Sequence, residues 1–335
     1  MIKTLVVDDS PVARDIIRDF LESEGSFQVI GEAGDGQEGL EKALALNPDL
    51  ITMDIDMPRM CGLEAIERIR EFLTTPIVVI SSHNTAKAAY EAARKGAVEF
   101  YDKEAFNAGT GAFKQTHVLE TLKQIAKMKR SHPLLGKPKG RPNTPLAARD
   151  VQGVVIAAST GGPKALTEFC SRMPCCFPAP IILVQHNTTG FDKGFAQWLD
   201  NYTPLRVKLA KEGERPLAGT LYVAPTDTHL TIFHGRFILD DSAPVNNQKP
   251  AADILFKSAA RSMGRALISV VLTGMGNDGA EGTRCVRDAG GITIAQDEAS
   301  SMIYGMPKAA LDTGCVDIVL PLDKIPERLV ALTRI

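Results

Sequence analysis

Residues 154–163, VVIAASTGGP, predict how the C-terminal half of this chain folds. The apolar run 154–158 has the length and composition of a buried strand, and Pro163 is typical of the first turn of a helix. Ser159 therefore stands between a strand and a helix N-terminus, beside two glycines. Exposed backbone N–H groups and the helix dipole make this a suitable place for a nucleophile, and equally for a bound phosphate. The serine alone does not distinguish catalysis from binding.

The same pattern occurs twice downstream. The apolar run 181–184 is followed by Gln185 and then His186. A further run, 267–272, leads into TGMGNDG, which contains Asp278. If these runs are parallel strands of one sheet, the polar residues emerge together at its carboxyl edge, where open α/β sheets bind ligands. Serine, histidine and aspartate supply a nucleophile, a general base and an orienting carboxylate for acyl transfer.

Other interpretations of these residues stay open. The order Ser, His, Asp and the lack of GxSxG exclude the α/β-hydrolase family but not the chemistry. Taken individually, His186 could be a hydrogen-bonded residue of the core or of its rim. Asp278 before Gly279 could mark a turn, and STGG could form a tight turn. The glycine loops could hold a nucleotide phosphate, although they match neither GxGxxG nor the P-loop and leave His186 unexplained. A regulated scaffold without activity is a third alternative. Loops that aim N–H donors at an oxyanion favour catalysis.

Length and composition indicate two globular domains. The chain has 335 residues, of which 44% are apolar and 23% charged, and its net charge is -2. It is long enough for two cores of ordinary size, and its charge gives no reason to expect a nucleic acid partner. No apolar run approaches the roughly 18 residues that span a bilayer, and acids follow the N-terminus too early for a signal peptide. We expect a cytoplasmic protein without membrane insertion, whose six cysteines are reduced thiols.

The first 126 residues alternate between strand and helix signals. Strands are predicted at residues 2–7, 28–32, 50–53, 77–80 and 98–101. This alternation favours a parallel, doubly wound sheet of five βα units. Ser10 and Pro11 predict a helix start, and the helical spacing of Ile16, Ile17, Phe20 and Leu21 predicts their burial on the sheet.

A segment rich in proline and basic residues follows, at residues 127–150. It holds little that could form a core, and we interpret it as a solvated linker. Strand and helix signals resume at residue 151 and continue to residue 335. The sequence thus predicts a domain at 1–126, a linker at 127–150 and a second α/β domain at 151–335.

Polar residues also follow the predicted strands of the first half. They are Asp8 and Asp9 after the first strand, Asp54 after the third, Ser81 after the fourth and Lys103 after the fifth. At the carboxyl edge of one sheet, these side chains would share a pocket. Clustered carboxylates suit Mg²⁺, which would neutralise a phosphoryl group arriving on Asp54. Ser81 and Lys103 would then hold the new phosphate oxygens.

With VVDDS at residues 6–10, MDIDMP at 53–58 and this serine and lysine, the first half resembles the receiver domain of bacterial response regulators. The resemblance implies that Asp54 is the phosphoacceptor and that a histidine kinase is the phosphodonor. It also implies a Mg²⁺ site formed by Asp8, Asp9, Asp54 and the backbone carbonyl of Asp56. Two positions depart from the pattern without removing a phosphorylation residue. Cys61 stands where aspartate or asparagine is common, and Glu104 stands where proline is usual.

The second half resembles the catalytic domain of the chemotaxis protein-glutamate methylesterase family, CheB. The shared motifs are IAASTGGPKAL, VQH with a following GF, LYVAPTDTHL, PAADILFKSAA, LTGMGNDGAEG and EASSMIYGMPKAA. The resemblance implies a catalytic domain without a cofactor that hydrolyses methyl-esterified glutamate side chains on chemoreceptors, with glutamine deamidation in some members. Ser159, His186 and Asp278 match the family triad, and the backbone N–H of Met275 matches an oxyanion donor. Asn187-Thr188 replaces an apolar residue and a proline, and His229 is a candidate neighbour of the site.

Together these resemblances imply an α/β protein with a flavodoxin-like (βα)5 receiver domain and a doubly wound, mainly parallel methylesterase domain. They imply that the unphosphorylated receiver blocks the cleft at Ser159. A switch from 1:99 to 99:1 open requires that phosphorylation favour the open state by about 5.5 kcal/mol. The expected partners are methyl-accepting chemotaxis receptors and a histidine kinase, and we expect a monomer.

Overall fold

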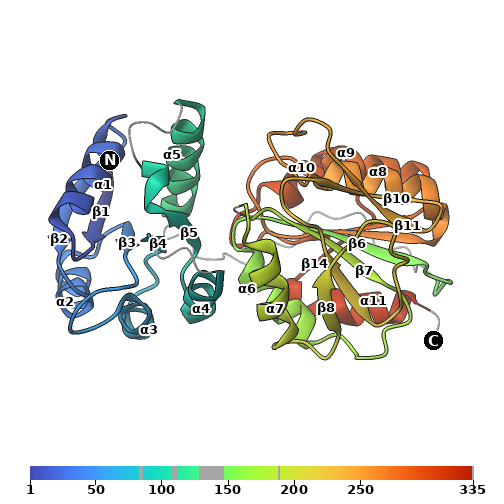
Figure 1. The fold of residues 1–335 in the computed structure, drawn as a ribbon, viewed down its shortest axis with the longest axis horizontal. Coiled ribbons are helices and arrows are strands. Elements are labelled where there is room, and N and C mark those ends of the chain that lie inside the picture. Colours follow the sequence, from blue (N-terminus) through green and yellow to red (C-terminus); the bar gives the residue numbers. More distant parts are fainter. Residues whose placement is uncertain (83–85, 107–111, 128–146, 188, 334–335) are drawn as a thin grey trace. The chain divides into compact units, whose positions relative to one another are not determined.

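The protein forms two compact units, Met1–Pro133 and Leu134–Ile335, shown in Figure 1. The structure is a computed structural model that describes residues 1–82, 86–106, 112–127, 147–187 and 189–333. The predicted linker spans the division between the units, and its residues 128–146 lie outside the described residues. Its bounds therefore stay a prediction.

The N-terminal unit contains a five-stranded parallel sheet in the order β2-β1-β3-β4-β5. The strands are β1 (Ile2–Val7), β2 (Phe27–Ala33), β3 (Leu50–Met53), β4 (Ile77–Ser81) and β5 (Glu99–Asp102). The helices are α1 (Pro11–Glu22), α2 (Gly36–Leu46), α3 (Gly62–Phe72), α4 (Ala86–Lys95), η1 (Lys103–Phe106) and α5 (Ala112–Lys127). Helices α1 and α5 cover one face of the sheet and α2, α3 and α4 the other (Figure 1). Every strand predicted for this half is present.

Helix α1 begins as the sequence predicts. Ser10 is extended at the N-cap and its hydroxyl accepts a hydrogen bond from the Ala13 N–H (3.3 Å). Ile17, Phe20 and Leu21 are buried on the sheet. The predicted burial of Ile16 is wrong, because its side chain is 38% exposed. With about 100° between successive residues of a helix, Ile16 falls at the border of the stripe formed by the other three.

The C-terminal unit contains a seven-stranded sheet in the order β14-β13-β12-β6-β7-β9-β8. Every described pairing in it is parallel. Its strands are β6 (Gly153–Ala158), β7 (Ile181–Gln185), β8 (Arg206–Leu209), β9 (Thr220–Val223), β12 (Leu267–Val271), β13 (Ile292–Gln296) and β14 (Ile318–Leu320). Strands β10 (His229–Phe233) and β11 (Arg236–Asp240) form a separate antiparallel hairpin.

Helices cover both faces of this sheet. They are α6 (Gly162–Ser171), α7 (Asp192–Asp200), α8 (Ala252–Met263), η3 (Gly264–Ala266), α9 (Ala280–Asp288), α10 (Met306–Asp312), η4 (Leu322–Lys324) and α11 (Ile325–Leu332). Figure 1 shows α8, α9 and α10 on one face and α6, α7 and α11 on the other. Burial on both faces explains why β6, β7 and β12 are continuous apolar runs. The predicted α/β fold is confirmed.

Strand β6 lies at the centre of the sheet, between β12 and β7. The chain continues from β6 to β7 on one side and returns to the other side of β6 as β12. Open α/β sheets commonly bind ligands at the carboxyl ends of their strands, next to such a reversal of strand order. The segments that follow β6, β7 and β12 therefore meet at one edge.

The helices of the described residues are those of a layered α/β protein. The longest of them, α5, has 16 residues. Among the residues that the structure describes, no helix combines the length and the apolar character needed to cross a membrane.

Candidate active site and candidate metal centre

Ser159 lies directly after β6, where backbone contacts from the neighbouring strands hold it. Its N–H donates to the carbonyl of Thr273, after β12 (3.0 Å), and its carbonyl accepts from the N–H of Gly162 (2.7 Å). The same carbonyl accepts a hydrogen bond from Gln185 Nε2 at the end of β7 (3.1 Å). These bonds fix the turn that carries the hydroxyl, and Pro163 lies in the first turn of α6 as predicted.

Glycines allow the chain to approach this turn closely. A Cβ on Gly162 would overlap the side chain of Gln185, and one on Gly274 would lie 2.8 Å from Ser159 Cβ. Gly161 has a φ of +76° and faces Met302, so a side chain there would be both strained and blocked. The loop after β12 therefore packs directly against Ser159.

His186 is the first residue after β7, and its N–H donates to the carbonyl of Ala158 (3.0 Å). Its ring is buried, and Nε2 lies 2.8 Å from Asp278 Oδ2. The other ring nitrogen, Nδ1, is buried and has no hydrogen-bond partner among the described residues. We assign the tautomer from these contacts: Nε2–H donates to the carboxylate, and Nδ1 carries a lone pair.

Asp278 lies in the loop between β12 and α9 and is only 2% exposed. Its Oδ2 accepts a second hydrogen bond, from the Ala252 N–H (2.6 Å), and its Oδ1 accepts one from the Asp253 N–H (3.0 Å). Burial alone would raise the pKa of Asp278, but the hydrogen bonds from His186 and these amides outweigh it, so the pKa lies below its ordinary value. Asp278 is therefore an ionised carboxylate at the N-terminus of α8.

Met275, the predicted oxyanion donor, follows Gly274 in the loop that packs against Ser159. Tyr304 forms an isolated parallel bridge with Gly274, and Met302 lies over Gly161. The segment 302–305 thus forms a wall beside the turn. The role of the Met275 N–H stays a prediction.

His229, a candidate neighbour of the site, is completely buried. Its Nδ1 accepts a hydrogen bond from the Ala251 N–H (3.1 Å), and its Nε2 lies 3.1 Å from the carbonyl of Ala243. It therefore supports the segment that enters α8. The sequence departs from the family pattern at Asn187-Thr188. Asn187 directly follows His186 and is partly buried, and Thr188 lies outside the described residues.

The structure brings the predicted acidic residues of the N-terminal unit together. One carboxylate oxygen from each of Asp8, Asp9 and Asp54 lies within 4.8 Å of the others. Lys103, directly after β5, places Nζ 2.6 Å from Asp54 Oδ2 and 2.7 Å from Asp8 Oδ2. Ser81, the last residue of β4, lines the same cleft. The sequence predicted this group correctly as neighbours.

The cleft beside these residues has a volume of about 370 Å³. Its lining residues are Asp9, Ser10, Ala13, Asp54, Asp56, Ser81, Ser82 and Lys103. Asp8 Oδ2 is buried and, within the described part of the chain, has no hydrogen-bond partner besides the ion pair with Lys103. Clustered carboxylate oxygens fit Mg²⁺, which prefers hard oxygen ligands. The cleft also has room for a phosphoryl group.

Charges in this cleft are strongly coupled. Burial raises the pKa of Asp8, against the opposing effect of Lys103. Burial lowers the pKa of Lys103, but its hydrogen bonds and ion pairs with Asp54 and Asp8 outweigh that effect and raise it overall. Lys103 therefore stays a cation that faces two carboxylates.

The two departures from the receiver pattern have local consequences. Cys61 occupies the N-cap of α3, where its side chain makes no capping hydrogen bond. Glu104 lies in η1, and its N–H donates to Asp102 Oδ1 (2.9 Å). Of the following loop, residues 107–111 lie outside the described residues.

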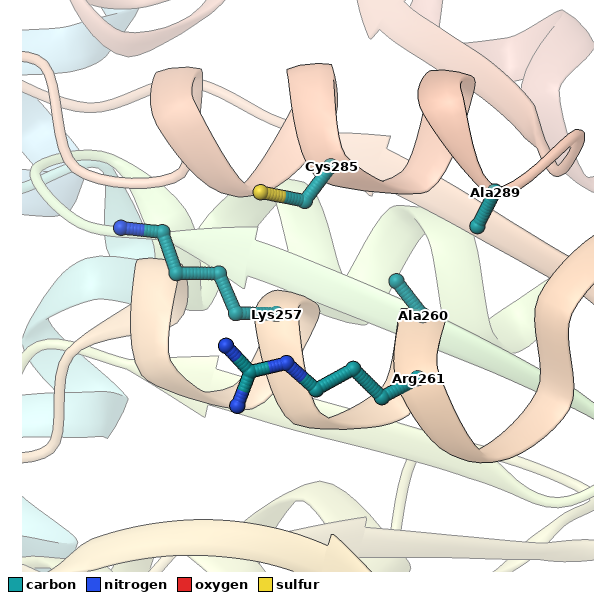
Figure 2. A pocket seen from close by; sticks show the side chains of 5 residues that line it. All are labelled: Lys257, Ala260, Arg261, Cys285 and Ala289. Carbon is teal, nitrogen blue, oxygen red and sulfur yellow. The ribbon is translucent and has the colours of Figure 1, made fainter.

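A second hollow lies on the C-terminal unit, between α8 and α9. Figure 2 shows its lining residues, Lys257, Ala260, Arg261, Cys285 and Ala289. Its volume is about 320 Å³, and none of the three strand-edge residues lines it. It is therefore not the candidate active site.

The fold and the two sites define a class of protein: a response regulator with a hydrolase-type output domain. A family model described as the response regulator receiver domain matches residues 4–108. A second, described as CheB methylesterase, matches residues 154–329. The chain belongs to the CheB methylesterase family.

Curated relatives agree over the whole chain. A protein-glutamate methylesterase/protein-glutamine glutaminase 2 of Anaeromyxobacter dehalogenans is 41% identical over 99% of this chain and 97% of its own. A protein of Thermotoga maritima named protein-glutamate methylesterase/protein-glutamine glutaminase is 40% identical over 99% of this chain and 98% of its own. The crystal structure of the Thermotoga maritima CheB methylesterase catalytic domain, 42% identical, matches with a TM-score of 0.54, covering 55% of this chain and all of that one.

Proposed function

We propose that this protein hydrolyses methyl esters of glutamate side chains on methyl-accepting chemotaxis receptors, and deamidates glutamine side chains, under the control of phosphorylation. The relatives that share its full length carry the names of both activities. One observation supports the chemistry most directly: His186 binds ionised Asp278 through Nε2, which leaves the buried Nδ1 free to accept a proton.

In the proposed mechanism, Ser159 Oγ attacks the ester carbonyl while His186 Nδ1 takes the hydroxyl proton. Asp278 keeps the ring in the required tautomer and stabilises the imidazolium. The Met275 N–H donates to the oxyanion of the tetrahedral intermediate. When this intermediate collapses, the proton on Nδ1 moves to the departing methoxide and methanol leaves. Water then attacks the acyl-serine by the reverse sequence and releases the glutamate.

The same machinery accounts for deamidation. A glutamine side chain presents the same acyl group with an amine in place of the methoxide. His186 would protonate that nitrogen, and ammonia would leave instead of methanol. Both reactions pass through the same acyl-serine and yield glutamate.

In the receiver, we assign Asp54 as the phosphoacceptor and a histidine kinase as the donor. The carboxylates of Asp8, Asp9 and Asp54, with the backbone carbonyl of Asp56, would hold Mg²⁺. Bound Mg²⁺ supplies positive charge that offsets the phosphoryl oxygens. Lys103 and Ser81 would hydrogen-bond the phosphate once it is on Asp54. Phosphorylation would then relieve a block on Ser159.

We further propose that the protein acts in the cytoplasm as a monomer, without a nucleic acid partner. Its near-neutral net charge of -2 supports the last point, because nucleic acid binding usually requires clustered positive charge. We propose the cytoplasm because the proposed receptor substrate and the proposed histidine kinase would both have to be reached there.

Ser159→Ala tests the proposal. Methanol release from a methylated receptor should fall by about 10⁴-fold or more, because the nucleophile is gone. Ser171→Ala, which removes an exposed hydroxyl from the same helix region, is the matched control and should release methanol normally. Methanol release at the normal rate by folded Ser159→Ala protein would refute the nucleophile assignment.

A further inference from the structure

Asp253 and Asp278 cap each other's helices in a closed pair. The Asp253 N–H, in the first turn of α8, donates to Asp278 Oδ1 (3.0 Å). In return, Asp253 Oδ1 accepts from the N–H of Gly279 (3.0 Å), the residue directly after Asp278. It also accepts from the N–H of Gly282 in the first turn of α9 (2.7 Å). The Asp278 carboxylate therefore lies at the N-terminus of α8, which contains Asp253, and the Asp253 carboxylate lies at the N-terminus of α9, which follows Asp278.

This pair is almost completely removed from water. Asp253 is 3% exposed, and its second oxygen, Oδ2, accepts a hydrogen bond from Asn246 Nδ2 (2.9 Å). Burial raises the pKa of Asp253, while the Gly282 N–H opposes that effect. A buried carboxylate is costly without such partners, and the helix dipole of α9 adds to them. Asp253 is therefore a second buried acid, and its hydrogen bonds hold the loop that contains Asp278.

The contact between α8 and α9 leaves this loop little freedom. A Cβ on Gly282 would lie 2.5 Å from Phe256 Cβ, so the two helices touch at this point. Gly279 has a φ of +91°, a conformation that glycine adopts readily and that its bond to Asp253 holds. Loss of the Asp253 carboxylate would leave two buried N–H groups unpaired and free Gly279 to rotate.

We propose that Asp253 is a positioning residue for the reaction: it holds the Asp278 loop so that Oδ2 stays opposite His186 Nε2. The inference rests on the proposed function, because its rate effect passes through the Ser159–His186 reaction. Asp253 makes no described hydrogen bond to His186 or Ser159, so it acts only through Asp278. Sequence reading gave it no role within PAADILFKSAA.

Steady-state methanol release from the full chain tests this role. Asp253→Ala should lower kcat by about 10²-fold at unchanged KM, because the base loses its alignment but substrate contacts remain. Asp253→Asn should recover most of this loss, since its amide oxygen can accept from the same two glycines and the Asn246 amide can reverse. Ser258→Ala removes a partly buried hydrogen bond that the Ile232 N–H donates to a hydroxyl of the same helix, so it is the control for lost stability and should leave kcat unchanged.

A double-mutant cycle separates positioning from a merely structural cap. In the Asp278→Asn background, Asp253→Ala should lower kcat little further, because its target is already lost. Equal fold losses in both backgrounds, or a normal kcat in folded Asp253→Ala, would overturn the proposal. If Asp253→Ala does not fold, Asn246→Gly removes only the side-chain donor to Asp253 at a residue with a φ of 52°. It should show a smaller kcat loss, again at unchanged KM, and a normal kcat would count against the proposal.

A proton NMR measurement keeps this inference separate from the proposed function. The His186 Nε2–H bound to a carboxylate should give a low-field resonance, assigned by its absence in His186→Gln. Asp253→Ala should shift or remove that resonance, and Asp253→Asn should retain it. If the wild-type protein releases no methanol, the proposed function fails, and this resonance still decides the role of Asp253. An unchanged resonance in Asp253→Ala contradicts it.

Discussion

The two units place a buried aspartate at the carboxyl edge of a parallel sheet, but they surround it differently. Asp54 is 4% exposed and Asp278 is 2% exposed, so neither is a surface acid. Asp54 accepts from the Ile55 N–H and faces the cation of Lys103 beside an open cleft. Asp278 accepts from two amides of α8 and from His186. One carboxylate faces room for a reaction, and the other has its oxygens occupied.

These surroundings suit the two carboxylates to different kinds of chemistry. An aspartate that receives a phosphoryl group needs an accessible oxygen and a movable cation, which a lysine side chain provides. An aspartate that orients a histidine needs a fixed position, which backbone N–H groups provide because they cannot move without the helix. The same residue type, at the carboxyl edge of a parallel sheet in both units, thus has surroundings that suit the proposed covalent chemistry in one unit and the proposed positioning role in the other.

The greatest loss of activity should come from a change to the carboxylate that binds His186. Asp278→Asn should lower methanol release by about 10⁴-fold. The amide has only one oxygen, so its NH₂ group must face either the Asp253 N–H or the Ala252 N–H and His186 Nε2. The carboxylate charge that stabilises the imidazolium is also lost. Methanol assays and a thermal melt on the same preparation measure rate and folding together. Glu281→Gln, which neutralises a half-exposed acid in α9, is the control. A folded Asp278→Asn protein with normal activity would remove the distinction between the two aspartates.

A second change breaks the open site. Asp54→Asn should leave basal methanol release unchanged and abolish its stimulation by a small-molecule phosphodonor, because an amide cannot accept the phosphoryl group. Allosteric couplings of this kind are typically about 5–150-fold, so the ratio of stimulated to basal rates is the quantity to measure. Asp19→Asn, at a side chain 83% exposed on α1, should keep the stimulation. Full stimulation of Asp54→Asn would show that another group is the acceptor.

A modest change in stability is expected at Cys61, which departs from the receiver pattern. Its backbone is extended, with φ −69° and ψ 157°, and its side chain makes no capping bond to α3. Cys61→Asp should stabilise the N-terminal unit by about 1 kcal/mol by accepting from an unpaired helix N–H. Urea unfolding of the full chain, followed by two probes, measures this. Cys61→Ala should give no gain, and an equal gain in both variants would argue against capping.

Much of both sites could be predicted from the sequence because apolar runs end where polar residues begin. Parallel strands share an edge, so the segments that carry Ser159, His186 and Asp278 were expected at one edge of the sheet once their strands were identified. His186 and Asp278 are in contact there. The same reasoning predicted that Asp54 and Lys103 are neighbours, and they form an ion pair. The error at Ile16 has the opposite origin: helical spacing identifies a stripe but does not locate its border, which depends on how the helix rests on the sheet.

Other features depend on tertiary contacts that no local pattern carries. The contact of Asp278 with Nε2 of His186 joins residues 92 positions apart, so no local pattern indicates which ring nitrogen makes it. No local pattern marks Asp253, because an aspartate in the first turn of a helix is common and its partners Gly279 and Gly282 lie 26 and 29 residues away. The signal that could have found it is an acid directly after Ala251 and Ala252 within PAADILFKSAA, together with the glycine-rich stretch TGMGNDG.

The central position of β6 has a consequence for how the protein refolds. His186 and Asp278 are 92 residues apart, and Asp278 arrives only when β12 pairs with β6 from the far side. Loop closure over such a distance is among the slower events in folding. Burial of the core and pairing of β6 with β7 can therefore precede any activity. Return of methanol release after dilution from urea should lag behind fluorescence from Trp198, and the delay measures the docking of β12.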